Sequence, residues 1–96
     1  MEFLKSNGFT DKDINDILDK YDEDTINSFL FNRSNVEEVI EYFKEYGIKN
    51  IPKLVLERID IFYLPCSKIK ELFSHYEKKS VIETLDYDAS IFDEMI

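Results

Sequence analysis

One stretch of the chain decides its fold class: residues 34–47, which read SNVEEVIEYFKEYG. Its apolar residues recur at spacings of three and four, so they fall on one face of a helix. These residues are Val36, Val39, Ile40 and Phe43. Ser34 and Glu37 have the spacing of a capping box, and Gly47 stands where a helix commonly ends. The stretch therefore predicts an amphipathic helix that begins at Ser34 and ends at Gly47.

The same signals continue toward the N-terminus. Gly8 is placed to end a short first helix, and Thr10, with an acid three residues later, is a good N-cap for a second. That second helix has an apolar stripe, followed by another apolar stripe in residues 22–31, for which Asp22 or Asp24 is the expected cap. The residues that we expect to face inward are Ile14, Ile17, Leu18, Tyr21, Ile26, Phe29 and Leu30.

Toward the C-terminus, Asn50 and Pro52 form a typical helix start. Residues 59–64 are β-branched and aromatic, and we interpret them as a buried helix end or a tight connector that Pro65 stops. A further helix is expected from about Ser67 to Glu77. Its predicted inward residues are Ile69, Leu72, Phe73 and Tyr76. Ser80 suggests a second capping box and a short helix, and residues 88–95 a last helical or frayed turn.

Composition agrees with a helical domain. The chain has 96 residues, of which 44% are hydrophobic and 15% aromatic, so it can bury one modest core. Only two glycines and two prolines are present, whereas sheets and long loops need many turn residues. We therefore expect an all-α fold of five to seven short helices, packed as helix-turn-helix repeat-like units in a single domain over residues 1–96.

Two internal matches support the repeat interpretation. Residues 34–43 match residues 67–76 at an offset of 33, with the serine and all four apolar positions in common. A weaker match joins FLKSNGF at residues 3–9 to YFKEYGI at residues 42–48. A period of 30–40 residues is typical of helical repeat arrays, although two amphipathic helices can also be alike by chance.

The two segments of the weaker match, residues 3–9 and 42–48, resemble a sequence motif of the mitochondrial transcription termination factor family. Residues 47–58 resemble the segment that follows this motif in the family. The resemblance covers about residues 3–76. It implies pairs of helices, each followed by a short 3₁₀ turn, stacked around a basic groove for nucleic acid. The groove candidates that it implies are Lys44, Lys49, Lys53 and Arg58. Acidic residues lie between them, and Ile59–Ile61 replace the expected proline, so only the architecture is carried over.

The chain is strongly acidic, with a formal net charge of −9. Eight acidic and three basic residues lie in positions 1–30, and seven acidic and four basic residues in positions 66–96, so the excess is concentrated at the two ends. A negative protein repels phosphate, which disfavours generic nucleic-acid binding and binding to anionic membranes. No leader pattern or membrane-spanning apolar run is visible, so a cytoplasmic location is the expectation. The sequence does not predict an oligomeric state.

No pattern of catalytic or metal-binding residues stands out. The single histidine and single cysteine, His75 and Cys66, are nine residues apart, which gives no zinc motif. A calcium loop starting at Asp11 lacks its central glycine. No serine has a glycine-rich elbow, and no glycine-rich phosphate loop is present. We therefore expect a protein that is not an enzyme and has no cofactor.

The remaining expectation is a protein-interaction module that inhibits or regulates a basic partner. Tyr42 and Tyr46 share one helical face, and tyrosine is enriched at interfaces. The predicted contact residues are Glu38, Glu41, Tyr42, Glu45 and Tyr46. The two rings could instead simply cover the edge of the core. Mimicry of DNA by the acidic surface, self-association, and nucleic-acid binding through the groove candidates named above remain as alternatives.

Overall fold

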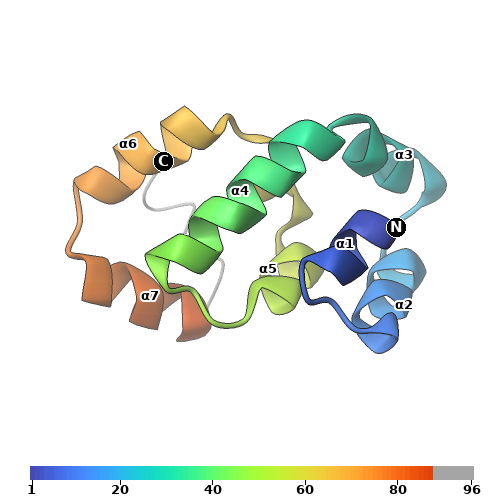
Figure 1. Ribbon diagram of the computed structural model, residues 1–96, viewed down its shortest axis with the longest axis horizontal. Helices are drawn as coiled ribbons and strands as arrows, with labels where there is room; N and C mark the ends of the chain where they lie inside the picture. The colour runs from blue at the N-terminus through green and yellow to red at the C-terminus, as the bar shows by residue number, and fades with distance from the viewer. Residues whose placement is uncertain (88–96) are drawn as a thin grey trace.

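The computed structural model of the chain describes residues 1–87, and in that part it contains seven α-helices, one 3₁₀ helix and no strand (Figure 1). The elements are α1 (Glu2–Ser6), α2 (Asp11–Lys20), α3 (Glu23–Phe31), α4 (Arg33–Tyr46), α5 (Ile51–Glu57), η1 (Ile59–Tyr63), α6 (Cys66–Ser74) and α7 (Lys78–Tyr87). This confirms the all-α prediction of five to seven short helices. The turn expected over residues 88–95 lies outside the described residues.

Helix α4 is the longest element and crosses the middle of the molecule (Figure 1). Helices α1, α2 and α3 lie toward one end, and α6 and α7 toward the other. The four apolar residues predicted to face inward from α4 are all completely buried. Complete burial of a large aliphatic or aromatic side chain contributes roughly 1.5–3 kcal/mol, so this single face is a large part of the stability of a small domain.

Glycines end α1 and α4 in the same way. Gly8 and Gly47 have φ values of 94° and 107°, in the left-handed region that other residues rarely adopt. In each case the next residue donates its backbone N–H to a carbonyl five positions earlier, at 3.0 Å: Phe9 to Leu4, and Ile48 to Phe43. The two sequence phrases that resemble each other are therefore two copies of one helix-ending motif.

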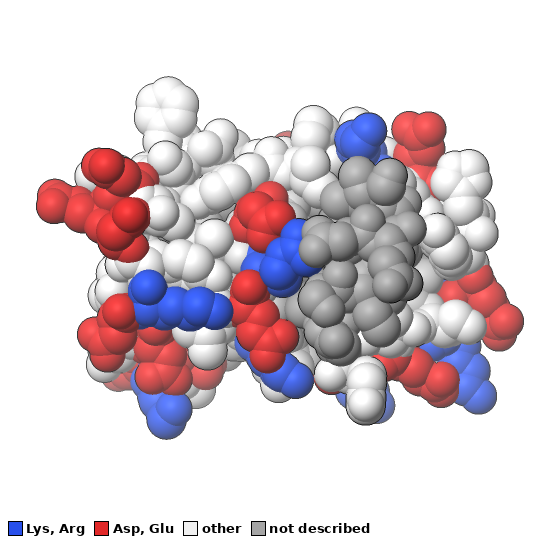
Figure 2. Space-filling model, turned by 180° about the vertical axis from the view of Figure 1, so that it is seen from behind, with Lys and Arg blue, Asp and Glu red and all other residues white. Residues whose placement is uncertain are grey.

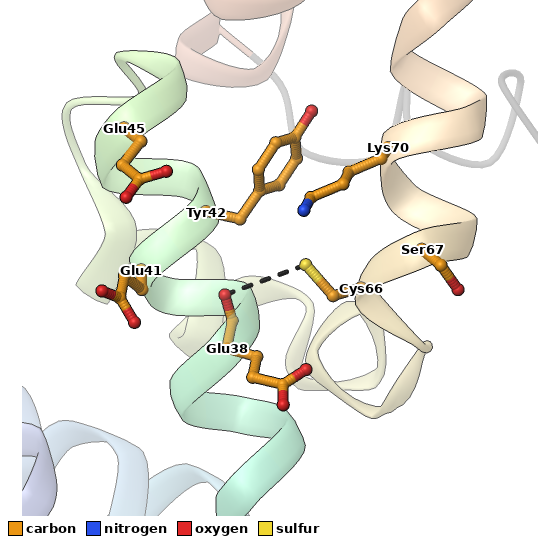
Figure 3. Close-up of a pocket in the computed structure, with 7 residues that line it drawn as sticks. All are labelled: Glu38, Glu41, Tyr42, Glu45, Cys66, Ser67 and Lys70. Atoms are coloured by element: carbon orange, nitrogen blue, oxygen red, sulfur yellow. Dashed lines mark hydrogen bonds between the residues drawn. The ribbon is translucent and has the colours of Figure 1, made fainter.

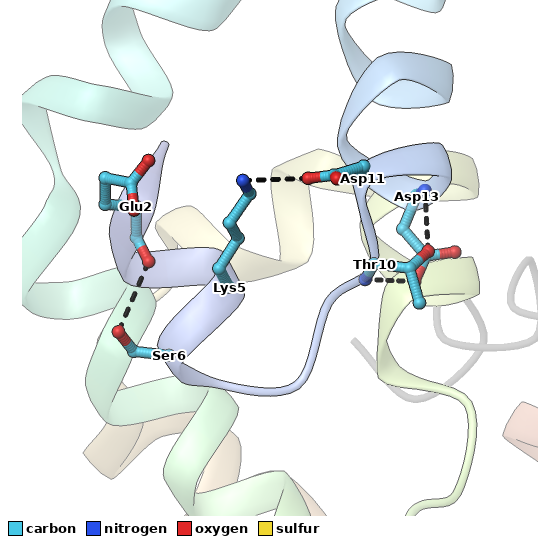
Figure 4. Close-up of polar contacts among 6 residues, drawn as sticks. All are labelled: Glu2, Lys5, Ser6, Thr10, Asp11 and Asp13. Carbon is cyan, nitrogen blue, oxygen red and sulfur yellow. Dashed lines mark hydrogen bonds and ion pairs between the residues drawn. The ribbon is translucent and has the colours of Figure 1, made fainter.

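Several helix starts follow the predicted caps. Thr10 forms a complete capping box with Asp13, in which the Asp13 N–H donates to the Thr10 hydroxyl and the Thr10 N–H to the Asp13 carboxylate (Figure 4). The Asp22 carboxylate accepts from the Thr25 N–H at 2.8 Å. An ion pair of 2.8 Å between Lys5 and Asp11 then joins α1 to α2.

Two predicted capping boxes are wrong. Helix α4 begins at Arg33, so Ser34 lies inside it and makes no cap; the carboxylate of Glu37 pairs instead with Arg33, at 2.9 Å. Helix α7 begins at Lys78, where the Val81 N–H donates to the backbone oxygen of Glu77, so Ser80 is in the first turn. In both cases the helix begins before the serine, so the serine is not at the N-cap position.

The internal repeat holds over two turns and then fails. Helices α4 and α6 begin 33 residues apart, and Ile40 and Phe73 are both buried, as their equivalent positions predict. Tyr76, which is equivalent to Phe43, is exposed because α6 ends at Ser74. Two other residues predicted to face inward, Leu18 and Leu30, are also exposed, each beside a residue that already fills the buried face.

The predicted connector before Pro65 is the 3₁₀ helix η1, with three buried apolar residues, Ile59, Ile61 and Phe62. Helix α5 ends at Glu57, so Arg58 lies between the two elements. The side-chain oxygen of Asn50 caps α5, and Pro52 lies in its first turn, as expected. Since η1 contacts α3, α4 and α5, it closes the core from one side.

Two phenylalanines of α3 provide a matched test of this core. Phe29 is completely buried, with its ring centroid 6.0 Å from that of Phe3, whereas Phe31 is 90% exposed. We expect Phe29→Ala to lower the free energy of unfolding by about 3–5 kcal/mol, because it leaves a cavity. The same change at Phe31 should alter that free energy by less than about 0.5 kcal/mol. Urea unfolding measures both, and equal losses would contradict this placement of α3.

Candidate functional site

A groove of about 410 Å³ lies between α4 and α6 (Figure 3). Its lining residues are Glu38, Glu41, Tyr42 and Glu45 from α4, and Cys66, Ser67 and Lys70 from α6. Four of the five residues predicted to contact a partner therefore line one concave surface. Concave surfaces that combine apolar area with a few polar groups are the usual form of binding sites.

Two polar contacts fix the distance between the walls of the groove. The Asn35 amide, on α4, donates to the backbone oxygens of Phe62 and Leu64, at 2.9 and 2.7 Å. This holds the chain just before α6 against α4. The Cys66 thiol lies 3.9 Å from the backbone oxygen of Glu38, which is a weak contact at the start of α6 (Figure 3). Each contact joins a side chain on one side of the groove to a backbone oxygen on the other, and none involves the groove's carboxylates.

Aromatic rings form the boundary between the groove and the core. The Tyr42 ring lies 6.0 Å from Phe73 of α6, and the Tyr46 ring lies 4.9 Å from it, between ring centroids. The two tyrosine rings are 5.7 Å apart, so they do share a face of α4. Burial raises the pKa of both hydroxyls, so both tyrosines are neutral at physiological pH.

Tyr46, the fifth predicted contact residue, is placed differently from Tyr42. It does not line the groove, and its hydroxyl oxygen is enclosed without a hydrogen-bond partner among residues 1–87. Lys78 of α7 lies over its ring, with 5.3 Å between the ammonium and the ring centroid. The position of Tyr46 is therefore that of a residue at the edge of the core, which was the other interpretation of these rings.

The carboxylates of the groove are not neutralised within the described part of the chain. The ion pairs there take Asp11, Asp16, Glu37, Glu57 and Asp60. Glu38, Glu41 and Glu45 form none, and in Figure 3 the last two project from the outer side of α4, away from α6. The one cation of the lining, Lys70, points toward the Tyr42 ring instead. The groove therefore carries an excess of negative charge.

The basic residues implied by the family resemblance do not form one surface. Lys44 donates to the Asn7 side chain at 3.3 Å, and Lys53 pairs with Glu57 at 3.9 Å. Arg58 pairs with Asp60, and its hydrogen bond lowers the pKa of that carboxyl. On the face shown in Figure 2, basic side chains are scattered among acidic ones.

Lys49 is the remaining candidate, and it lines a second open groove of about 560 Å³. Lys78 and Lys79 of α7 line the same groove, and neither was predicted from the sequence. Three acidic residues, Glu77, Glu83 and Asp86, also line it. The three cations are thus balanced by three carboxylates, so this groove does not provide a concentrated positive potential for phosphate.

Sequence reasoning missed the α6 wall, which consists of Cys66, Ser67 and Lys70. The internal match placed residues 67–76 in register with the helix that became α4, and this was the only available signal. A match in register does not specify that two helices pack side by side, so it could not identify the groove.

No group of three His, Cys, Asp or Glu side chains within residues 1–87 is arranged to hold a metal ion. None of the helices in this range is both long and apolar enough to cross a bilayer. Comparison of the chain with family models, with curated proteins and with solved structures finds no match. The family resemblance continues to rest on the quoted residues alone.

The enclosed hydroxyl of Tyr46 leads to a stability prediction. A buried polar group without a partner costs roughly 1–3 kcal/mol, so Tyr46→Phe should raise the free energy of unfolding by about 1 kcal/mol. The matched change Tyr42→Phe should have an effect below about 0.5 kcal/mol, because that hydroxyl is not enclosed. Thermal and urea unfolding of both variants measure this, and a destabilised Tyr46→Phe variant would contradict it.

The scattered cations lead to a prediction about nucleic acid. We expect no binding to a generic 20-base-pair DNA duplex at physiological salt, because net charge and local ion pairs both oppose it. Fluorescence anisotropy with a labelled duplex measures this. Sub-micromolar binding that weakens steeply with salt, and is lost when Lys49, Lys53 and Arg58 are changed to Glu, would restore the alternative function.

Proposed function

We propose that this chain is a non-enzymatic protein-interaction module that binds a basic segment of a partner protein in the α4–α6 groove. The observation that carries the proposal is the groove itself, whose α4 wall combines the Tyr42 ring with three carboxylates that form no ion pair within residues 1–87. A partner's lysines and arginines would supply the missing counter-charges. Charge complementarity of this kind speeds association and selects partners.

The three carboxylates are available because α4 buries its opposite face. Val39, Ile40 and Phe43 fix the helix in the core, so Glu38, Glu41 and Glu45 have no part in packing. They are spaced over about two turns of one helix, which is a length that an extended or helical peptide can follow. A partner segment would therefore meet a rigid acidic edge that does not need to reorganise on binding, which lowers the entropic cost.

The ring of Tyr42 gives the groove an apolar surface beside this acidic edge. Aromatic side chains supply contact area with little loss of conformational freedom, and they attract cations to the ring face. The aliphatic part of Lys70 and the Cys66 side chain form the facing wall. Such a mixed surface suits the side chains of lysine and arginine, which have apolar stems and charged heads.

The first test is binding of a fluorescein-labelled peptide of alternating arginine and alanine, followed by anisotropy. The triple variant Glu38→Gln, Glu41→Gln, Glu45→Gln should weaken binding roughly ten-fold, or about 1.4 kcal/mol, because exposed charge pairs contribute up to about 1 kcal/mol each. The matched control, Asp19→Asn, Glu23→Gln, Asp24→Asn, makes the same change in net charge on α2 and α3, and should weaken binding less than about three-fold. Equal losses would mean that the peptide responds only to net charge.

A second readout uses the only cysteine of the chain, Cys66, which lines the groove. A peptide bound there should slow the reaction of the thiol with N-ethylmaleimide, because it covers the start of α6. The reaction can be followed by intact-mass spectrometry with increasing peptide, and the triple groove variant serves as the control. An unchanged rate at saturating peptide would place binding outside the groove.

Changing both tyrosines to serine, by contrast, is a poor test. Tyr42 and Tyr46 both contact the buried ring of Phe73, so their removal would disturb the packing of α6 on α4. A loss of binding could then reflect lost structure. The carboxylate variants avoid this difficulty because all three residues are exposed.

A further inference from the structure

A cation of the chain itself already occupies the centre of the groove. The ammonium of Lys70 lies 5.3 Å from the centroid of the Tyr42 ring, within the usual range of a cation–π contact (Figure 3). Lys70 forms no ion pair with the carboxylates of the groove in the described part of the chain. The ammonium of Lys70 therefore contacts the Tyr42 ring and does not pair with the carboxylates that line the groove.

We infer that Lys70 is an internal substitute for the ligand, and that the partner inserts an arginine which displaces it from Tyr42. This inference rests on the proposed function and specifies the chemistry of the partner. Lys70 is exposed and extends from the opposite wall, so it can leave the ring for solvent without disturbing the core. Until a partner arrives, its ammonium shields Tyr42 and lowers the affinity of the groove for other cations.

Arginine fits this position better than lysine does. Its guanidinium is flat, so it can stack on the Tyr42 ring while its edge donates hydrogen bonds to a carboxylate. Glu38 is one helical turn before Tyr42 on the same face of α4, and both line the groove. A lysine ammonium is a compact point charge that cannot stack and donate in this way. Lys70 shows this limitation. Its ammonium contacts the Tyr42 ring but forms no ion pair with a carboxylate of the groove in the described part of the chain.

The other lysine that lies over a tyrosine does not offer an equivalent site. Lys78 lies over Tyr46, but the Tyr46 hydroxyl is enclosed and its ring packs against Phe73 at 4.9 Å. Lys78 lines the second groove together with three carboxylates, but Tyr46 lines neither of the two grooves described above, so its ring is not part of either site. The combination of a displaceable cation, an accessible ring and a carboxylate without an ion pair is found at Tyr42.

The test compares Lys70→Met with Lys68→Met, using the same arginine–alanine peptide. Both variants lose one positive charge from α6, but only Lys70 lines the groove. Lys70→Met should strengthen peptide binding at least three-fold more than Lys68→Met does. Equal effects of the two variants would overturn the inference, because they would show that net charge alone is responsible.

Two further measurements test whether the gain needs the Tyr42 hydroxyl and whether it needs the guanidinium charge of the peptide. The gain from Lys70→Met should persist in a Tyr42→Phe background, where a ring remains, and disappear with a peptide that contains citrulline in place of arginine. A peptide with lysine in place of arginine should show a smaller gain. A gain that survives the citrulline replacement, or is as large with lysine, would contradict displacement by arginine.

Backbone amide shifts in NMR titrations separate this inference from the proposed function. Peptide-induced shifts confined to α4 and α6, without a specific gain from Lys70→Met, would overturn the role of Lys70 and leave the groove as a binding site. Shifts elsewhere, or none with the wild-type chain and with Lys70→Met, would overturn both. Shifts in α4 and α6 together with the specific gain support both.

Discussion

Burial of one face of α4 is the interaction on which the rest of the structure depends. The α-helices within residues 1–87 are 5–14 residues long, and helices of this length are marginal by themselves. Helix α4 contacts α3, α5, η1 and α6, so it gives these short elements a common apolar surface. Because this face is fixed in the core, the opposite edge of the same helix is held in a defined position, and that edge forms a wall of the groove.

The parts of the fold that were predictable from the sequence are those decided by neighbouring residues. Gly47, Thr10 and Asn50 act within four or five positions, so a local pattern was sufficient to place these helix ends. Ser34 and Ser80 failed as caps because each helix began earlier, where α3 or α6 had just ended. The starting points of those helices depend on how the preceding element is packed, and no local pattern contains that information.

The candidate site also has a part that local sequence patterns predicted and a part that they did not. Periodicity separated the buried stripe of α4 from its outer residues, and this was enough to select Glu38, Tyr42 and their neighbours. The α6 wall requires knowledge of which helices pair, and a pairing between positions about 28 residues apart is a tertiary property. The difference between Tyr42 and Tyr46 has the same origin, since it depends on what encloses each hydroxyl rather than on spacing along α4.

The two faces of α4 are subject to different evolutionary constraints. Substitutions at Ile40 or Phe43 must preserve volume and shape, because each side chain is completely enclosed. Positions 38, 41 and 45 have no partner within residues 1–87 to lose, apart from the backbone contact of Glu38, so the side chains there can change with little effect on folding. The charge pattern of the acidic edge could therefore diverge quickly between related chains while the scaffold is retained, and one helix could serve successive partners without a change of fold.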